Sequence, residues 1–391
     1  MKKTMEKVSL LSLSLMLVST FSPSTALPQM ITHFKSQGVS ASQVESLFSI
    51  SSFAILGMLV LTPWLSKVLS ERLTVICGLV LIAFGGSMPL VWQSYPLMLV
   101  SRILLGVGIG FINARAINII SENYQGQERV RLLGLRGSFE VLGNAILTAL
   151  VGFLIAFGWS KAFVIYLFAL PILVLYLAFA PRHSVKKSED SEHPKARFTA
   201  KDLLYIIGLA LLAGFVINVN SANSLRIPVL VDSLKLGTAS QASLALSAMM
   251  LMGIVAGVCF GPLMSGLKKY LTPLALIFFA GSLLLIAKAP NLLLLTAGAM
   301  LSGFLYSLVV TSAFTLVSEK MAAPLIGTAT TIVLFFCNLG GASAAIVLKL
   351  FKYLNPNPSA AFLYYALISV VIGVIYLLTQ LVTSRKTFKK A

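Results

Sequence analysis

The sequence has very few charged residues. They make up 11% of its 391 residues, whereas hydrophobic residues make up 58%. A soluble chain of this length would form two or three domains and carry charge on about a quarter of its residues. Soluble domains are therefore excluded, because too little polar surface is present to cover them. The composition also excludes collagen, coiled coils and intrinsic disorder, which leaves an integral membrane protein.

Cysteine and histidine are also scarce, with three of each. Cys77, Cys259 and Cys337 lie far apart within apolar stretches, where cysteine packs as a small hydrophobic residue. The histidines do not cluster, so we expect no metal site and no cofactor. The chain has no nucleotide-binding domain and no phosphate-binding loop, so we do not expect ATP-driven transport. We also do not expect an enzyme.

Long apolar runs, by contrast, fill the chain. A membrane-spanning helix needs about 20 apolar residues to cross about 30 Å of hydrocarbon, whereas the strands of a β-barrel are shorter and alternate. Twelve runs meet the helix requirement, and the first is counted as a retained span, not as a secretion signal. We therefore predict an all-α integral membrane protein with twelve transmembrane helices. The predicted spans are 8–30, 43–66, 73–92, 96–121, 132–157, 160–180, 202–226, 240–264, 270–288, 292–318, 324–350 and 358–383.

The net charge of +18 comes mainly from basic residues in the breaks between these runs. With the N-terminus inside, most of them fall on the cytoplasmic side, as the positive-inside rule requires. We therefore predict a multi-pass protein of the cell membrane, in contact with the lipid bilayer, with both termini cytoplasmic and no nucleic-acid partner. Residues 182–201 are predicted to be a cytoplasmic linker and residues 385–391 a cytoplasmic tail. The chain has no N-glycosylation sequon free of proline, which favours a bacterial source.

The two sides of the linker repeat each other. Gly106 in the fourth run is followed fifteen residues later by Ser121-Glu122, and Gly303 in the tenth is followed by Ser318-Glu319 at the same distance. Further pairs share offsets of 197 to 199 residues. Residues 1–181 and 202–384 are therefore predicted to be two pseudo-symmetric six-helix halves. Parallel repeats of this kind bind substrate between the halves, near the membrane midplane.

The fourth run carries a motif in which Arg102 is followed by Gly106 and Gly108. Leu27-Pro28 and Gly158-Trp159 stand near the first and sixth runs. In these features the whole chain resembles the major facilitator superfamily, especially its twelve-helix drug and metabolite exporters. The resemblance implies the major facilitator fold, a monomer, and transport of a small-molecule substrate by alternating access. It also places the Arg102 face of its helix toward the central pathway.

The loop after the second run departs from the family pattern. That pattern has a Gly, an Asp four residues later and then a basic residue, whereas Lys67 stands at the position of the Asp. The counterpart loop of the second half also lacks an acid. The resemblance assigns both loops to the cytoplasmic gate. The predicted gating residues are Pro63, Ser66, Lys67, Arg72, Gly261, Ser265 and Gly266.

Four ionisable residues lie well inside predicted spans: Arg102, Arg115, Arg136 and Glu140. Each costs about 2.5–3.5 kcal/mol to insert, so a functional role is the first hypothesis for any of them. Depth along the fourth and fifth helices predicts that Glu140 pairs with Arg115 or Arg136. Such a pair is either structural or a site of proton coupling, and direct contact of Glu140 with the substrate is a third alternative. For Arg102, a cavity role competes with hydrogen bonding to neighbouring carbonyls.

Polar residues also gather toward the outer end of the first helix in each half. Thr20, Ser22 and Thr25 align with three asparagines of the second half at an offset of 198. Cavity lining competes here with hydrogen bonding between helices. The predicted substrate-cavity residues are Arg102, Asn113, Asn144, Asn218, Asn220, Asn223, Thr20 and Ser22.

The sequence thus predicts a secondary transporter of a small organic molecule. The leading hypothesis is proton-coupled efflux of a drug or metabolite, with Glu140 as the proton carrier. The alternative is uptake of a small organic or inorganic anion that uses the positive charge of Arg102 and Arg115. Translocation of a lipid or glycolipid is a further alternative.

Overall fold

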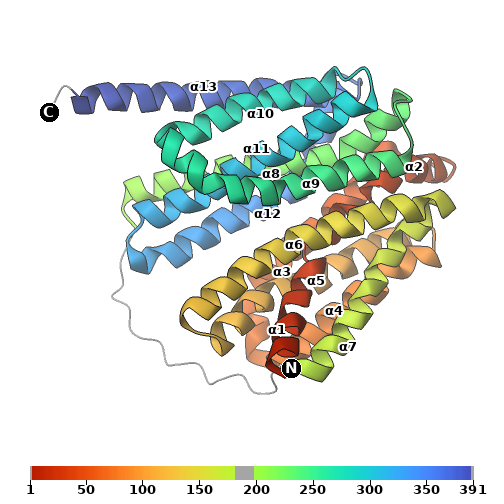
Figure 1. Ribbon diagram of the computed structural model, residues 1–391. Coiled ribbons are helices and arrows are strands. Elements are labelled where there is room, and N and C mark those ends of the chain that lie inside the picture. The colour runs from red at the N-terminus through yellow and green to blue at the C-terminus, as the bar shows by residue number, and fades with distance from the viewer. Residues whose placement is uncertain (1, 181–197, 389–391) are drawn as a thin grey trace. The chain divides into compact units, whose positions relative to one another are not determined.

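The computed structural model describes residues 2–180 and 198–388, and nearly all of them are helical (Figure 1). No strand occurs in these two ranges, so the predicted all-α class is confirmed. The helices before residue 181 are α1 (Lys2–Ser12), η1 (Leu13–Met16), η2 (Ser19–Ala26), α2 (Leu27–Lys35), α3 (Ala41–Val68), α4 (Glu71–Ser87), η3 (Met88–Leu90), α5 (Tyr95–Asn123), α6 (Gly126–Leu154), η4 (Ile155–Phe157), η5 (Trp159–Phe168) and α7 (Ala169–Phe179). Those after residue 197 are α8 (Ala200–Ser233), α9 (Ala239–Leu267), η6 (Lys268–Tyr270), α10 (Leu271–Ala287), α11 (Leu292–Lys320), α12 (Ala323–Leu354) and α13 (Ala360–Phe388).

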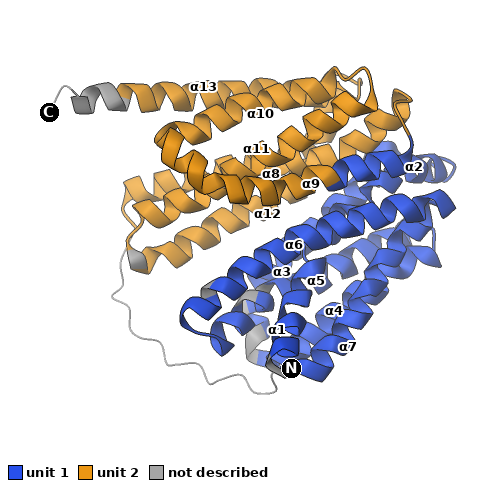
Figure 2. Ribbon diagram, viewed as in Figure 1, with its two compact units in different colours: residues 1–195, 238–247 blue, residues 196–237, 248–391 orange. Residues whose placement is uncertain are grey.

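The chain forms two compact units, coloured separately in Figure 2. Unit 1 contains residues 1–195 and 238–247, and unit 2 contains residues 196–237 and 248–391. The short stretch in unit 1 is the start of α9, where the hydroxyls of Ser243 and Ser247 donate to the α6 carbonyls of Thr148 and Ala145. Most of the predicted linker lies in residues 181–197, which are outside the described residues, so that boundary stays a prediction. The predicted tail begins within α13, which ends at Phe388.

The first span of unit 1 is broken. Two helical segments, Thr4–Met16 and Ser19–Lys35, meet at an angle of 47°, and residues 19–26 form a 3-10 helix instead of an α-helix. The sequence there is STFSPSTA. Serine and threonine offer their own hydrogen bonds to the backbone, and Pro23 lacks an N–H and clashes with the carbonyl four residues earlier. The composition of this segment therefore explains why a regular α-helix is interrupted.

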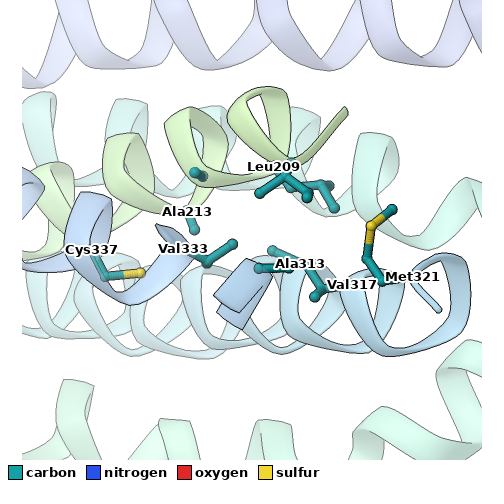
Figure 3. Packing of buried hydrophobic residues seen from close by; sticks show 10 residues of the cluster. Leu209, Ala213, Ala313, Val317, Met321, Val333 and Cys337 are labelled. Carbon is teal, nitrogen blue, oxygen red and sulfur yellow. The ribbon is translucent and has the colours of Figure 1, made fainter. Parts of the chain in front are cut away.

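Unit 2 is built from longer, more regular helices. Its first helix, α8, runs without a break for 34 residues and packs against α11 and α12. Figure 3 shows the apolar cluster between these three helices, where small residues let the helices approach. The buried members are Ile206, Leu209, Ala210 and Ala213 of α8, Ala313 and Val317 of α11, Met321, and Ala329, Val333 and Cys337 of α12.

Ten helical segments in the described residues are long and apolar enough to span a membrane, or eleven if the bent first pair is counted as one span. One of the ten, Ala239–Ala287, has 49 residues, which would measure about 74 Å as a straight helix. This segment is α9 and α10, between which the chain reverses in Figure 1. Lys268 adopts a left-handed conformation at the reversal, with φ of 49°. Counting the bent first pair as one span, and α9 and α10 as two, gives the twelve spans that the sequence predicts.

The predicted repeat is visible in how glycines pack. A Cβ added to Gly106 of α5 would collide with the carbonyl oxygen of Ser51 on α3. The equivalent addition at Gly303 of α11 would collide with the carbonyl oxygen of Met249 on α9. The glycines are 197 residues apart and their partners 198. Both units therefore bring their second and fourth spans into backbone contact at the same place.

Candidate functional site

A fully buried arginine lies inside unit 1. Arg102 of α5 has no exposed surface. It donates from Nη1 to the hydroxyl of Tyr166 and from Nη2 to the carbonyl of Gly86, both at 3.4 Å. Its guanidinium carbon lies 4.7 Å from the ring centre of Phe163 and 5.3 Å from that of Tyr166. No carboxylate of the described residues is within salt-bridge distance, so aromatic faces and weak hydrogen bonds solvate this cation.

Tyr166 connects Arg102 to the broken first span. Its hydroxyl donates to the carbonyl oxygen of Ser19 at 2.9 Å. In an α-helix that carbonyl would accept from the N–H of residue 23, but Pro23 has no N–H. The Tyr166 hydroxyl therefore supplies a donor that the first span cannot supply itself.

Unit 2 has a tyrosine in the matching place. Tyr365 of α13 donates to Oδ1 of Asn218 on α8 at 2.6 Å. The amide nitrogen of Asn218 donates in turn to the carbonyl of Gly340 and the hydroxyl of Ser343 on α12, at 3.0 and 3.1 Å. Farther along α8 lies Arg226, a residue that is only 7% exposed.

The two tyrosine centres correspond residue by residue. Tyr166 and Tyr365 are 199 residues apart, and so are their acceptors Ser19 and Asn218. Each tyrosine joins the sixth span of its unit to the first. A buried arginine, Arg102, lies beside Tyr166, and unit 2 has a buried arginine of its own, Arg226. The arginines come from different elements, because Arg102 belongs to the fourth span of its unit and Arg226 to the first. The repeat in the sequence therefore could not reveal the second arginine.

Arg226 is a residue that sequence reasoning missed. The predicted span ended at residue 226, which assigned this arginine to the outer surface. The structure corrects this, because α8 continues to Ser233 and Arg226 is buried inside it. The apolar residues Ile227 to Val231 beyond the arginine were the signal that the helix continues.

Glu140 pairs with Arg136, one of the two partners predicted for it. The two side chains lie one turn apart on α6, with Nη1 of Arg136 3.2 Å from Oε2 of Glu140. Nη2 of Arg136 also reaches Oδ1 of Asn113 on α5, at 3.4 Å. Nε of Arg136 is buried and makes no hydrogen bond in the described part of the chain. The structure does not bring Arg115 to this pair.

Arg115 pairs instead with Glu71, at 2.9 Å between Nη1 and Oε1. Sequence reasoning missed Glu71 because the predicted third span began at residue 73, which left this acid in a loop. In the structure α4 starts at Glu71 itself, after Ser70, whose side chain accepts from the N–H of Leu73 as a helix cap. A serine followed by an acid was the signal for this earlier helix start.

Most of the predicted cavity residues bond to other helices. The hydroxyl of Ser22 donates to Oδ1 of Asn144 on α6 at 2.9 Å, and Nδ2 of Asn223 donates to the hydroxyl of Ser302 on α11 at 2.9 Å. Thr20 is buried in η2, and Asn220 is half-buried in α8. Interhelical hydrogen bonding, one of the two alternatives, thus accounts for Ser22, Asn144, Asn218 and Asn223 in this structure. A role in binding substrate stays a prediction.

All seven predicted gating residues lie in helices, and not in loops. Both α3 and α9 extend beyond the predicted spans, so only Leu69 and Ser70 separate α3 from α4. Arg72 lies in the first turn of α4 and donates to the carbonyl of Leu177 on α7 at 3.2 Å. In α9, Gly261, Ser265 and Gly266 are exposed. Pro63, Ser66 and Lys67 lie in α3, and their side chains are outside the described part of the structure.

The described residues contain no group of three or more His, Cys, Asp or Glu side chains that could hold a metal ion. The three cysteines are free thiols. The chemistry that these residues can perform is ion pairing, hydrogen bonding and proton exchange.

Comparison with solved structures identifies the fold. The fold matches a D-xylose-proton symporter with a TM-score of 0.75 and 14% identity, over 96% of this chain and 97% of that chain. It matches the peptide transporter POT with a TM-score of 0.75 and 14% identity, over 95% and 93%. It matches the nucleoside transporter NupG with a TM-score of 0.74 and 13% identity, over 95% and 99%. The chain therefore shares the fold of these three proteins.

The sequence profile of the Major Facilitator Superfamily matches residues 9–345, and this chain belongs to that family. A relative is the cyanate transport protein CynX of Escherichia coli (strain K12), which is 26% identical over 278 residues, 69% of this chain and 71% of the relative. The family and the fold predicted from the sequence are thus confirmed. The protein is a secondary transporter of small molecules.

Proposed function

We propose that this protein transports a small anion. The observation that carries the proposal is the charge of Arg102, which is fully buried and has no carboxylate of the described residues within salt-bridge distance. A buried cation loses its hydration, and an anion that enters the transport pathway restores part of the lost stabilisation.

The similarity to a protein named for cyanate transport supports the same substrate class, because cyanate is a small monovalent anion. Efflux of a cationic drug, which falls under the leading hypothesis from the sequence, would be favoured by buried acids. The buried Arg102 has the opposite charge. Anion transport, the alternative hypothesis, therefore fits these residues better.

Inward movement of an anion also needs a coupled cation. A membrane potential that is negative inside opposes anion entry by about 2.3 kcal/mol per charge per 100 mV. A proton carried with the anion removes this cost. We propose Glu140 as its carrier, because its side chain is 27% exposed beside that of Arg136, which is 13% exposed. The carboxylate is thus partly accessible, and a single arginine balances its charge.

Flux into proteoliposomes tests the substrate class. Purified protein is reconstituted, and uptake of labelled cyanate and formate is compared with uptake of neutral urea and cationic choline. We expect saturable uptake of the two anions and background rates for urea and choline. Saturable choline flux without anion flux would overturn the proposal.

The variant Glu140→Gln tests the coupling. We expect it to lose anion accumulation driven by an inward proton gradient while it retains exchange of labelled for unlabelled anion. Glu319→Gln, which removes an exposed acid at the end of α11, is the matched control and should behave as wild type. Gradient-driven accumulation that persists in Glu140→Gln would remove Glu140 from the mechanism.

A further inference from the structure

The ion pair of Arg136 and Glu140 lies at the middle of its span and is not sealed from its surroundings. The helix α6 runs from Gly126 to Leu154, and Glu140 stands fourteen residues from each end. The side chain of Arg136 is 13% exposed and that of Glu140 is 27% exposed, whereas Arg102 has no exposed surface. Substrate and coupling-ion sites of transporters built from repeated halves lie at this depth.

Arg136 has more hydrogen-bond donors than its two partners use. A guanidinium carries five N–H groups and no acceptor. Nη1 faces Oε2 of Glu140 at 3.2 Å, and Nη2 faces Oδ1 of Asn113 on α5 at 3.4 Å. Nε is buried and has no hydrogen-bond partner within the described residues. Nε and the adjacent Nη2 form one edge of the guanidinium, whose parallel N–H groups match two oxygens of a planar anion.

The carboxylate of Glu140 neutralises the charge of Arg136. A proton on this carboxylate removes its negative charge and leaves a mostly buried guanidinium without compensation, which is costly. An anion beside Arg136 restores the balance. An anion that arrives while Glu140 is still ionised instead sets two negative charges against one arginine, which is also unfavourable. The proton and the anion therefore each favour the binding of the other.

Other ionisable groups near α6 do not take part in this balance. The elements packed against α6 are α1, η1, η2, α5, η4, η5 and the start of α9. Their ionisable residues with described side chains are Glu6 and Lys7 of α1, Tyr95, Arg102, Arg115 and Glu122 of α5, and Lys161 and Tyr166 of η5. None of these forms an ion pair or hydrogen bond with Arg136 or Glu140. The charge balance at Glu140 thus depends on Arg136.

We propose that Arg136 binds the transported anion through its Nε edge when Glu140 takes up a proton. The proton adds to the carboxylate and forms a neutral carboxylic acid, and the anion replaces that carboxylate as the counter-charge of the guanidinium. When the anion leaves, the proton leaves Glu140 and the ion pair forms again. One proton and one monovalent anion move together, so no net charge is carried. The site rests on the proposed anion transport and adds the residue that holds the anion.

Proton uptake during formate binding tests this exchange in the wild-type protein. Sodium formate is titrated into purified full-length protein by calorimetry at pH 6 and pH 8, in buffers of different ionisation enthalpy, with sodium gluconate as the blank. We expect about one proton to be taken up per formate at pH 8, and the affinity to rise by up to tenfold per pH unit as pH falls. Binding without proton uptake would overturn the exchange.

Two variants test Arg136 as the ligand of the anion. Glu140→Gln keeps the size of the side chain but cannot take up a proton, and the double variant Arg136→Gln/Glu140→Gln leaves neither member of the pair with a charge. We expect Glu140→Gln to bind formate at pH 8 at least as tightly as wild type does at pH 6. The double variant should bind at least tenfold more weakly than Glu140→Gln. Glu319→Gln, which removes an exposed acid, is the matched control and should bind as wild type.

Equal formate affinity in Glu140→Gln and the double variant would overturn Arg136 as the ligand, and saturable anion flux in wild type would then leave anion transport standing. The proton count uses wild type, so it decides the exchange even if a variant does not fold. If wild type neither binds formate nor transports formate or cyanate, the site and the proposed function both fall.

Discussion

In unit 1 the buried tyrosine of the sixth span donates to a backbone carbonyl, and in unit 2 it donates to a side chain. Tyr166 bonds the carbonyl of Ser19, whereas Tyr365 bonds Oδ1 of Asn218. The first span of unit 1 is broken at that point, whereas α8 of unit 2 continues as one helix. The contact between the sixth and first spans thus occurs in both units. The first span has an interrupted helix in unit 1 and a continuous helix in unit 2.

A second difference lies where the fourth span of each unit ends. Tyr124 follows α5 and Met321 follows α11, 197 residues later. The hydroxyl of Tyr124 donates to Glu6 of α1 at 2.9 Å, next to an ion pair of Lys7 with Glu128. Met321 instead packs in the apolar cluster of unit 2 (Figure 3). The residue after the fourth span therefore makes a packing contact in both halves, but the contact is polar in unit 1 and apolar in unit 2.

The largest expected loss of stability tests the close helix contact at Gly106 and Gly303, which both units share. Gly106→Ala and Gly303→Ala each force a Cβ against a backbone oxygen, so each should destabilise the fold by about 3 kcal/mol or more, at the upper end of overpacking costs. The measurement is the apparent melting temperature of the purified protein. Gly57→Ala and Gly208→Ala, which meet no atom within 4 Å, are the controls. Equal stability of Gly106→Ala and Gly57→Ala would show that the close approach is wrong.

An intermediate loss of stability is expected when the hydrogen bonds of Tyr166 and Tyr365 are removed, and it tests the difference between their acceptors. Tyr365→Phe leaves Asn218 Oδ1 without this donor, which should cost about 1–3 kcal/mol. Tyr166→Phe should lower the melting temperature further, because it deprives both the Ser19 carbonyl and the buried Arg102 of a partner.

Pro23→Ala provides the control for this pair. It restores an N–H that can bond the Ser19 carbonyl, so it should recover part of the stability lost in Tyr166→Phe and none of that lost in Tyr365→Phe. Equal losses in both tyrosine variants, with no recovery by Pro23→Ala, would contradict the distinction between backbone and side-chain acceptors.

The smallest effect is expected at Tyr124. Tyr124→Phe removes the bond to Glu6 and should cost about 0.5–1.5 kcal/mol. Burial and, secondly, the hydrogen bond to Glu6 raise the pKa of Tyr124. This contribution is therefore complete below the ordinary tyrosine pKa of about 10 and is lost only as pH rises through the raised value. The melting-temperature difference from wild type should stay constant between pH 6 and pH 9, and a difference that shrinks in this range would refute the assignment.

The sequence predicted the features that depend on hydropathy and on the repeat. The apolar runs and the 197-residue offset of Gly106 and Gly303 were enough for the spans and for two similar halves. Helix ends were predicted less well, because capping by Ser70 and the continuation of α8 past Arg226 are local effects that a hydropathy window averages out.

The ion-pair partners of the charged residues inside the spans could be predicted only in part. Glu140 and Arg136 are four residues apart on one helix, so their pairing follows from helix geometry. Arg115 and Glu71 come from different helices, and their pairing depends on how α4 and α5 pack. The placement of Arg102 beside Tyr166 likewise depends on tertiary structure, which sequence spacing does not contain.

The broken first span of unit 1 has a consequence for its length. A 3-10 helix rises about 2.0 Å per residue and an α-helix about 1.5 Å. The eight residues of η2 are therefore about 4 Å longer than the same residues would be as α-helix. Residue for residue, this part of the chain reaches farther across the bilayer than the matching part of α8.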